Sequence, residues 1–206
     1  MLFQPTKILR KSVAWTSLLS TVAGVNVIQY SRDFCSGNRG LCTNIGSTVC
    51  CITNFPWGFD SAKVSGTTSD TDYQYVYNWA GGTCCGRRVS IARAKDCIST
   101  GSNLCGHAWC RDKECAKLPA VVTTGAAAAG CNSSVKANLV EIDNKWFDVS
   151  GNGTVSEAHI AKLWSLSAAQ VPAAEIPKDL LKYETLAPAL DDDGGMEKKM
   201  GRRRNR

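Results

Sequence analysis

The segment Tyr73-Gln74-Tyr75-Val76-Tyr77-Asn78-Trp79 alternates aromatic residues with other side chains. Alternation of this kind places every second side chain on the same face of a β-strand. Two further segments, residues 25–30 and 88–92, show shorter patterns of the same type, and Ser65-Gly66 and Gly81-Gly82 are typical of turns. The sequence therefore predicts a β-rich region that extends in both directions from this strand.

The cysteines are concentrated in the same region. All 11 of them lie between Cys35 and Cys131. In an oxidising compartment such a density indicates disulfides, because crosslinks persist there. The doublets Cys50-Cys51 and Cys84-Cys85 direct neighbouring side chains to opposite faces of a strand, so the members of each pair should bond to different partners and tie two layers together. Because the count is odd, at least one thiol is free or pairs with another chain.

The N-terminus has the pattern of a secretory signal peptide. Three basic residues precede a short, mostly apolar run from Val13 to Val22, and Thr21-Val22-Ala23 supplies the small residues that a signal peptidase recognises. We therefore expect residues 1–23 to be a cleaved signal peptide and the mature protein to be secreted and extracellular. The alternative is a buried or amphipathic N-terminal helix. No segment has the ~20 consecutive apolar residues of a membrane span.

The charge distribution argues against nucleic acid as a partner. The whole chain carries a formal charge of +6, but residues 1–23 hold three Lys or Arg and residues 198–206 hold six. The body between them, residues 24–197, has fifteen basic residues against all 18 acidic ones, a net charge of −3. A nucleic-acid-binding protein needs a basic face on its folded body.

Composition divides the mature chain into parts. We expect a cysteine-rich β domain at residues 24–118, an Ala/Gly connector at 119–131, a helical module at 132–186 and a disordered charged tail at 187–206. The predicted fold class is therefore α+β, with a small disulfide-rich β domain followed by the helical module.

The helical prediction for residues 132–186 follows from apolar spacing. A first helix is predicted from Val135, Leu139, Ile142 and Trp146, and a second, beginning at Ser156, from Ile160, Leu163 and Trp164. A third short helix is predicted at Pro177, because proline suits the first turn of a helix.

The segment between the first two helices, from Asp148 to His159, resembles an EF-hand calcium loop, and the resemblance covers residues 135–166. It implies a calcium site, with Gly153 at the sharp turn. The implied ligands are Asp148, Ser150, Asn152, Thr154, Ser156 and His159. His159 replaces the usual bidentate glutamate, and Asp148 is the one carboxylate, so the expected dissociation constant is ~10⁻⁴–10⁻³ M. The alternative is a loop held by Asx-type hydrogen bonds without calcium.

Other candidate sites are weaker. Asn132 and Asn152 begin N-glycosylation sequons, which are compatible with passage through a secretory pathway. Tyr73, Tyr75, Tyr77 and Trp79 would line one strand face, either as a carbohydrate-binding platform or, as we favour, as part of a small core.

Two functions follow from these observations. The chain has two histidines and lacks a Gly-x-Ser-x-Gly elbow, so we predict that it is not an enzyme. Its overall build resembles the small secreted cysteine-rich proteins of fungi. The first interpretation is a secreted cysteine-rich protein that binds calcium weakly. The alternative is an extracellular binding or effector protein whose cysteine-rich domain binds a glycan or a protein, with a purely structural helical module.

Overall fold

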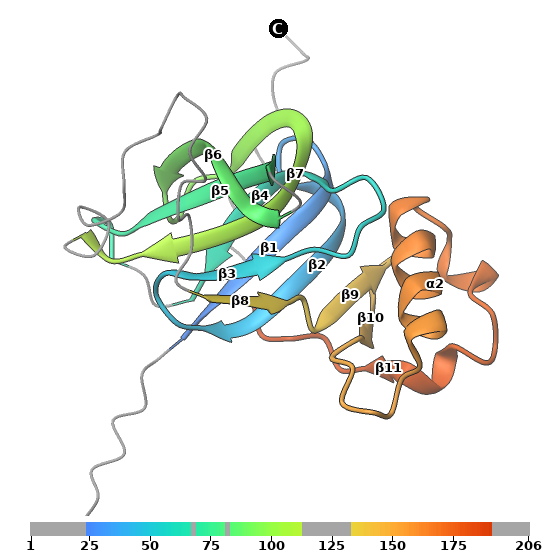
Figure 1. Ribbon diagram of the computed structural model, residues 1–206. Helices are drawn as coiled ribbons and strands as arrows, with labels where there is room; N and C mark the ends of the chain where they lie inside the picture. Colours follow the sequence, from blue (N-terminus) through green and yellow to red (C-terminus); the bar gives the residue numbers. More distant parts are fainter. Residues whose placement is uncertain (1–23, 67–68, 81–82, 113–132, 191–206) are drawn as a thin grey trace, which may run out of the picture.

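The computed structural model describes residues 24–66, 69–80, 83–112 and 133–190. Within these residues the chain forms an eleven-stranded, mostly antiparallel sheet and one α-helix, α2 (Figure 1). The predicted signal peptide, the connector and most of the tail lie outside the described residues. The strands are β1 (Val25–Arg32), β2 (Ser36–Ile45), β3 (Val49–Ile52), β4 (Phe59–Ser65), β5 (Tyr73–Ala80), β6 (Thr83–Arg93), β7 (Ile98–Cys110), β8 (Ser133–Lys136), β9 (Leu139–Ile142), β10 (Lys145–Asp148) and β11 (Glu184–Thr185). The helical elements are α2 (Glu157–Ala168) and the 3₁₀ turns η1 (Ala173–Glu175) and η2 (Leu181–Tyr183).

The sheet closes on itself. Its strand order is β11-β10-β9-β2-β1-β4-β7-β3-β8, and β5 and β6 extend it from the other edge of β7. The last strand of this order, β8, is separated from β9 by only Ala137 and Asn138. The N–H groups of these two residues donate to the carbonyls of Ile52 (3.0 Å) and Leu41 (2.9 Å). The segment from β8 to β9 therefore connects β3 to β2 and completes a barrel-like ring.

One large core fills this arrangement. It draws buried side chains from the strands of the ring: Val25, Val27, Cys42, Ile45, Cys51, Phe59, Ala62, Val64, Ile98, Leu104, Trp109, Val140 and Ile142. A disulfide joins Cys42 to Cys51 within it. Cys50 lies instead in a second cluster with Tyr75 and Tyr77. The two members of this doublet therefore face different clusters, as the strand geometry predicted.

The α+β prediction is wrong, because the chain is a β-rich domain with a single α-helix in the described residues. The helix predicted from Val135 to Trp146 is absent: this stretch forms β8, β9 and β10, and its strands join the same sheet as the cysteine-rich region. Asp143 and Asn144 take positive φ angles of 49° and 65° and form the two-residue turn between β9 and β10. Such a turn suits a β-hairpin and interrupts a helix.

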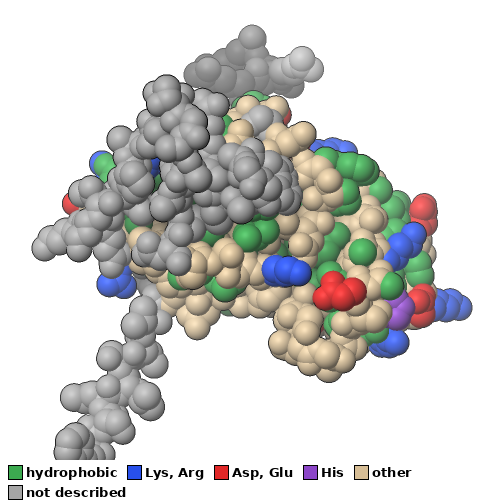
Figure 2. Space-filling model, in the orientation of Figure 1, with side chains coloured by type: hydrophobic (Ala, Val, Ile, Leu, Met, Phe, Trp, Pro, Cys, Tyr) green, Lys and Arg blue, Asp and Glu red, His purple; other side chains and the backbone are tan. Residues whose placement is uncertain are grey.

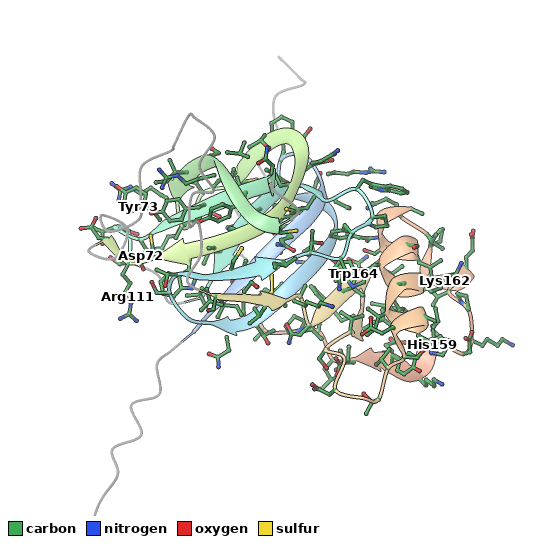
Figure 3. The ribbon with its side chains drawn as sticks, in the orientation of Figure 1. Asp72, Tyr73, Arg111, His159, Lys162 and Trp164 are labelled. Carbon is green, nitrogen blue, oxygen red and sulfur yellow. A yellow bond between two sulfur atoms is a disulfide. The ribbon has the colours of Figure 1, made fainter. Side chains whose placement is uncertain are left out.

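The second predicted helix is confirmed as α2. Ser156 caps its N-terminus, and Ile160, Leu163 and Trp164 are buried. Trp164 points toward the sheet and Lys162 away from it (Figure 3). Trp164 packs edge-on against Phe55, with ring centroids 4.6 Å apart. The third predicted helix is reduced to the short 3₁₀ turn η2.

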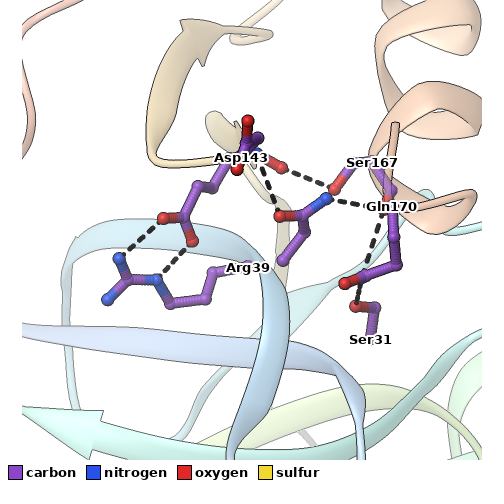
Figure 4. Close-up of polar contacts among 7 residues, drawn as sticks. Ser31, Arg39, Asp143, Ser167 and Gln170 are labelled. Atoms are coloured by element: carbon purple, nitrogen blue, oxygen red, sulfur yellow. Dashed lines mark hydrogen bonds and ion pairs between the residues drawn. The ribbon is translucent and has the colours of Figure 1, made fainter. Parts of the chain in front are cut away.

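A polar network fixes the C-terminal end of α2 to β1, β2 and β9 (Figure 4). Asn38 donates to the carbonyl of Ser167 (2.9 Å), and the Ser167 hydroxyl donates to the carbonyl of Glu141 (2.6 Å). Gln170 donates to the hydroxyl of Ser31 (2.6 Å). Beside these bonds, Arg39 makes a two-pronged ion pair with Glu141 at 2.5 and 2.8 Å. The helix is thus fixed by both apolar and polar contacts.

No helix in the described residues is long and apolar enough to cross a membrane.

The contact between Gly40 of β2 and Trp164 gives a test of this fold. A Cβ atom on Gly40 would lie 2.7 Å from the Trp164 ring, so Gly40→Ala should displace the ring and lower the free energy of unfolding by about 1–3 kcal/mol. Gly46→Ala is the matched control, because the nearest atom to its Cβ would be 3.8 Å away. Urea denaturation followed by tryptophan fluorescence measures both. Equal stability of the two variants would contradict the packing of α2 on β2.

Candidate functional site

The most unusual surface feature is the turn between β1 and β2, Asp33-Phe34-Cys35. Phe34 is 84% exposed, although it is a large apolar residue. Phe34 and Cys35 have φ angles of 56° and 52°, in the left-handed region that side chains with a Cβ adopt at a cost of about 1–2 kcal/mol per residue. The chain therefore holds an apolar ring in water on a strained backbone.

Hydrogen bonds from two neighbouring strands hold this turn. The N–H of Phe34 donates to the hydroxyl of Ser99 on β7 (3.2 Å), which itself donates to the Asp33 carboxylate (2.7 Å). The N–H of Cys35 donates to the hydroxyl of Ser61 on β4 (2.8 Å), and that hydroxyl donates to the carbonyl of Arg32 (2.5 Å). Each serine thus accepts from one turn residue; Ser99 donates to another turn residue and Ser61 to the last residue of β1, which fixes the backbone of the turn against the sheet.

A disulfide adds a covalent link at the same position. Cys35 is bonded to Cys97, 62 residues away, which precedes β7. The turn is thereby attached to the rest of the sheet independently of the β1–β2 pairing. Together the disulfide and the serine contacts account for a strained turn that persists, because surrounding structure must over-determine such a conformation.

A second exposed aromatic residue, Trp57, lies at the same end of the sheet. It is 67% exposed and stands two residues before β4, whose N-terminal end is adjacent to the C-terminal end of β1 in their antiparallel pairing. Gly58 next to it packs against β7: a Cβ there would lie 2.3 Å from the carbonyl oxygen of Leu104. A Cβ on Gly101, also in β7, would lie 3.8 Å from the Asp33 carboxylate. β7 thus lies close to a sequence neighbour of each exposed aromatic residue, Asp33 beside Phe34 and Gly58 beside Trp57.

The predicted calcium loop lacks the first flanking helix of an EF-hand, because β10 precedes it. The Asp148 carboxylate accepts the N–H of Ser150 (2.8 Å), an Asx-type hydrogen bond. The Ser156 hydroxyl accepts the N–H of His159 as the N-cap of α2. Asn152, between Gly151 and Gly153, and Thr154, which follows Gly153, are exposed, and both glycines have positive φ. Within the described residues no group of three or more His, Cys, Asp or Glu side chains is placed to hold a metal ion. Calcium binding stays a prediction.

His159 is used in a contact with η2. Its Nδ1 atom is 2.9 Å from the hydroxyl of Tyr183, and its Nε2 atom is 3.6 Å from a carboxylate oxygen of Asp179. Tyr183 also lines a hollow of about 430 Å³ with Asp148, Thr154, Val155, Lys182, Glu184 and Thr185. Charged side chains of both signs surround His159 at this end of the molecule (Figure 2). The imidazole therefore connects α2 to η2.

The remaining predicted sites fall in different places. Tyr75 and Tyr77 are buried and Tyr73 is half-buried, so they form no exposed carbohydrate platform; the side chain of Trp79 lies outside the described part. Of the two glycosylation candidates, Asn152 is exposed and Asn132 lies outside the described residues. Asp72, Tyr73 and Arg111 lie together at the opposite end of the molecule from His159 (Figure 3).

The other histidine, His107, is fully buried within the sheet. Its Nε2 atom is 2.9 Å from Oε1 of Gln74. The amide of Gln74 donates from Nε2 to the carbonyls of Arg93 (2.9 Å), Ala94 and Asp96, so its oxygen faces the imidazole and must accept. His107 therefore carries its proton on Nε2. Burial lowers the pKa of His107 to about 3.

The sequence alone does not single out Phe34 as a candidate site residue. Phenylalanine and cysteine rarely adopt left-handed φ, so nothing in Asp33-Phe34-Cys35 predicts this turn. The Cys35–Cys97 pairing could not be assigned from the cysteine spacing. The one available signal was that a short polar turn region contains an isolated aromatic residue.

Variants of Ser156 separate the two interpretations of the loop from Asp148 to His159: a calcium site, or a loop held by hydrogen bonds without calcium. Ser156→Ala should lower the free energy of unfolding by about 1 kcal/mol in the presence of a chelator, because the N-cap hydrogen bond is lost. Ser156→Asp should retain the stability, since aspartate is also a good N-cap. Urea denaturation with and without calcium measures both effects. Calcium-dependent stabilisation that disappears in Asp148→Ala would establish the loop as a calcium site, whereas equal stability of the three Ser156 forms would contradict the cap.

The buried imidazole predicts how stability depends on pH. The unfolded chain takes up a proton at His107 as the pH falls through about 6.5, whereas the folded protein does so only near pH 3. This contribution to stability is therefore complete above pH 6.5 and is lost as the pH falls, at about 1.4 kcal/mol per pH unit. His107→Gln should reduce the slope between pH 6 and pH 4.5 in denaturation experiments, with His159→Gln as the control for the other histidine. An unchanged slope in His107→Gln would overturn the assignment.

Comparison with known proteins provides no relative from which to transfer a function. No family model matches the chain, and neither a curated protein nor a solved structure is similar to it. The function has to be inferred from the residues and their geometry.

Proposed function

We propose that the protein is a secreted, non-enzymatic binding protein that attaches to a partner protein through the turn that presents Phe34. The observation that carries this proposal is the exposure of Phe34 on a backbone that is both strained and fixed. A ring that is 84% exposed adds little to the stability of its own fold. The ring is therefore free to make a contact outside the molecule, while the serine and disulfide contacts maintain the turn.

Disulfides support an extracellular location. Cys35–Cys97 and Cys42–Cys51 are bonded, and Cys110 is also a disulfide cysteine. Such bonds persist in secreted proteins and are rare in a reducing cytosol. The predicted signal peptide at residues 1–23 would deliver the chain to that compartment.

Rigidity of the turn supports a binding role. Association costs free energy when flexible groups become ordered, and a group that is already held in its bound conformation avoids much of that cost. The serine hydrogen bonds and the Cys35–Cys97 disulfide remove the backbone freedom of Phe34 before any partner arrives. Large aromatic residues of this type often contribute most of the binding energy in a protein interface.

The shape of the feature favours a protein over a glycan. A single ring on a tight turn fits a pocket, whereas stacking on sugar rings uses a flat exposed platform. The tyrosine row that could have formed such a platform is largely buried. The proposal involves no catalytic step, and the helical segment serves to support the sheet.

The first test separates a binding role from a structural one. Phe34→Asn should leave the free energy of unfolding unchanged or raise it by up to about 1 kcal/mol, because asparagine tolerates the left-handed conformation better than phenylalanine. Urea denaturation measures this. A loss of 2 kcal/mol or more would show that the ring stabilises the fold and would contradict the proposal.

The second test measures binding with a defined probe. Random twelve-residue peptides displayed on phage are selected on the immobilised secreted chain, and the selected peptides are then tested on variants. Phe34→Asn should weaken their binding at least tenfold. Leu186→Asn is the matched control, because Leu186 is 90% exposed but belongs to no such turn. Selected peptides that bind Phe34→Asn as well as the original protein would refute a binding role for this turn.

A further inference from the structure

The segment between β10 and α2 contains the only Asn-Gly pair of the chain, Asn152-Gly153. Val149 and Val155 are buried on either side of this pair and anchor the segment in the large core. Residues 151–154 between them are all exposed. A reaction at Asn152 therefore takes place in solvent and needs no opening of the fold.

The fold holds neither of the two groups that can react with each other in this pair. In the part of the chain that the structure describes, no hydrogen bond involves the side-chain amide of Asn152 or the N–H of Gly153. Gly153 has a φ of 81°, and a Cβ placed on it would meet no atom within 4 Å apart from its chain neighbours. Glycine has wide backbone freedom and no side chain to shield its nitrogen. The nitrogen of Gly153 can therefore approach the side-chain carbonyl carbon of Asn152.

We propose that Asn152 is a site of spontaneous deamidation in the folded protein. The nitrogen of Gly153 loses its proton and forms a bond to Cγ of Asn152. The bond from Cγ to Nδ2 breaks, and Nδ2 takes up a proton and leaves as ammonia. One water molecule then opens the resulting succinimide ring, at Cγ to give aspartate or at the main-chain carbonyl carbon to give isoaspartate. The sum of the steps exchanges ammonia for water, with no oxidation or reduction.

The reaction yields a second, more acidic form of the protein. It adds one negative charge to residues 24–197, whose net charge is −3, and it removes the asparagine of the sequon Asn152-Gly153-Thr154. Because the new carboxylate lies in the exposed part of the segment, α2 and the sheet keep their packing. The inference is independent of the binding role of the Phe34 turn.

Peptide mapping of the secreted chain after incubation at neutral and mildly alkaline pH tests the proposal. Trypsin releases residues 146–162, which contain Asn152, and residues 137–145, which contain Asn138 and Asn144. The first peptide should gain the mass of an NH₂-to-OH exchange and split into two chromatographic forms. This should happen faster at the higher pH, because the attacking nitrogen must lose a proton. The second peptide should stay unmodified, although Asn144 is also exposed, because Lys145 and not glycine follows it.

Comparison with the urea-unfolded chain tests the part of the proposal that depends on the structure. The folded and unfolded chains should deamidate at rates of the same order, whereas a reaction that required global unfolding would be slower in the folded chain by about a thousandfold or more. Gly153→Ala should slow the reaction in the unfolded chain, where loop strain plays no part, and Asn152→Asp should unfold at the same urea concentration as the original protein.

Three results would overturn the proposal. The first is a peptide 146–162 that stays unmodified in the folded chain while it reacts in the unfolded one. The second is a glycan on Nδ2 of Asn152 in every secreted chain, because that nitrogen could then not leave as ammonia. The third is a lower urea midpoint for Asn152→Asp, which would show that the fold depends on the amide.

Discussion

The two backbone hydrogen bonds of Ala137 and Asn138 hold the ends of the sheet together. They join the carbonyl of Ile52 on β3 to that of Leu41 on β2 through consecutive residues of one segment. Without this link the core between β2 and β3 would open on one side. The short strand β8, whose side chains are exposed, is held mainly by the pairing of its backbone with β3. The link also explains why the chain after residue 132 cannot be described as a separate helical unit, since β9 and α2 pack on the strands that carry the cysteines.

The closed sheet also determines where polar groups are tolerated. His107, Gln74 and Gln29 are fully buried, and each forms at least one hydrogen bond, Gln29 with the carbonyl of Cys51. A buried imidazole is compatible with this core only in its neutral form, and the fixed orientation of Gln74 selects which nitrogen carries the proton. The same interior therefore combines stability at neutral pH with sensitivity to acid. The turn between β1 and β2 shows the opposite arrangement, with the apolar ring of Phe34 exposed to water.

The sequence predicted local structure well where one signal dominated. Alternation identified β1, β5 and β6, and the spacing of Ile160, Leu163 and Trp164, with Ser156 before them, identified α2. Between residues 135 and 146 two signals competed. Apolar residues at helical intervals predicted a helix, but Asp143-Asn144 is a turn dipeptide between short segments that contain β-branched or aromatic residues, and this signal should have carried more weight. Pairing with β2 and β3, which no local pattern reveals, decided the outcome. The resemblance to an EF-hand rested on the spacing of oxygen-bearing residues; in the structure the oxygen of Asp148 serves an Asx-type bond and that of Ser156 a helix cap.

The candidate site could not be predicted for a different reason. The conformation of the turn that carries Phe34 depends on residues that are distant in sequence. These are Ser61 on β4, Ser99 on β7 and Cys97. Each of them reduces the freedom of a turn whose own residues disfavour its conformation. If the turn only connected β1 to β2, glycine or asparagine in place of Phe34 would relieve the backbone strain without any loss of function. The three contacts that fix the turn would then serve little purpose. Two of these contacts hold Cys35 and one holds the N–H of Phe34, and together they fix where the exposed ring points. We propose that a partner protein requires this position of the ring, because the ring itself contributes almost nothing to the core.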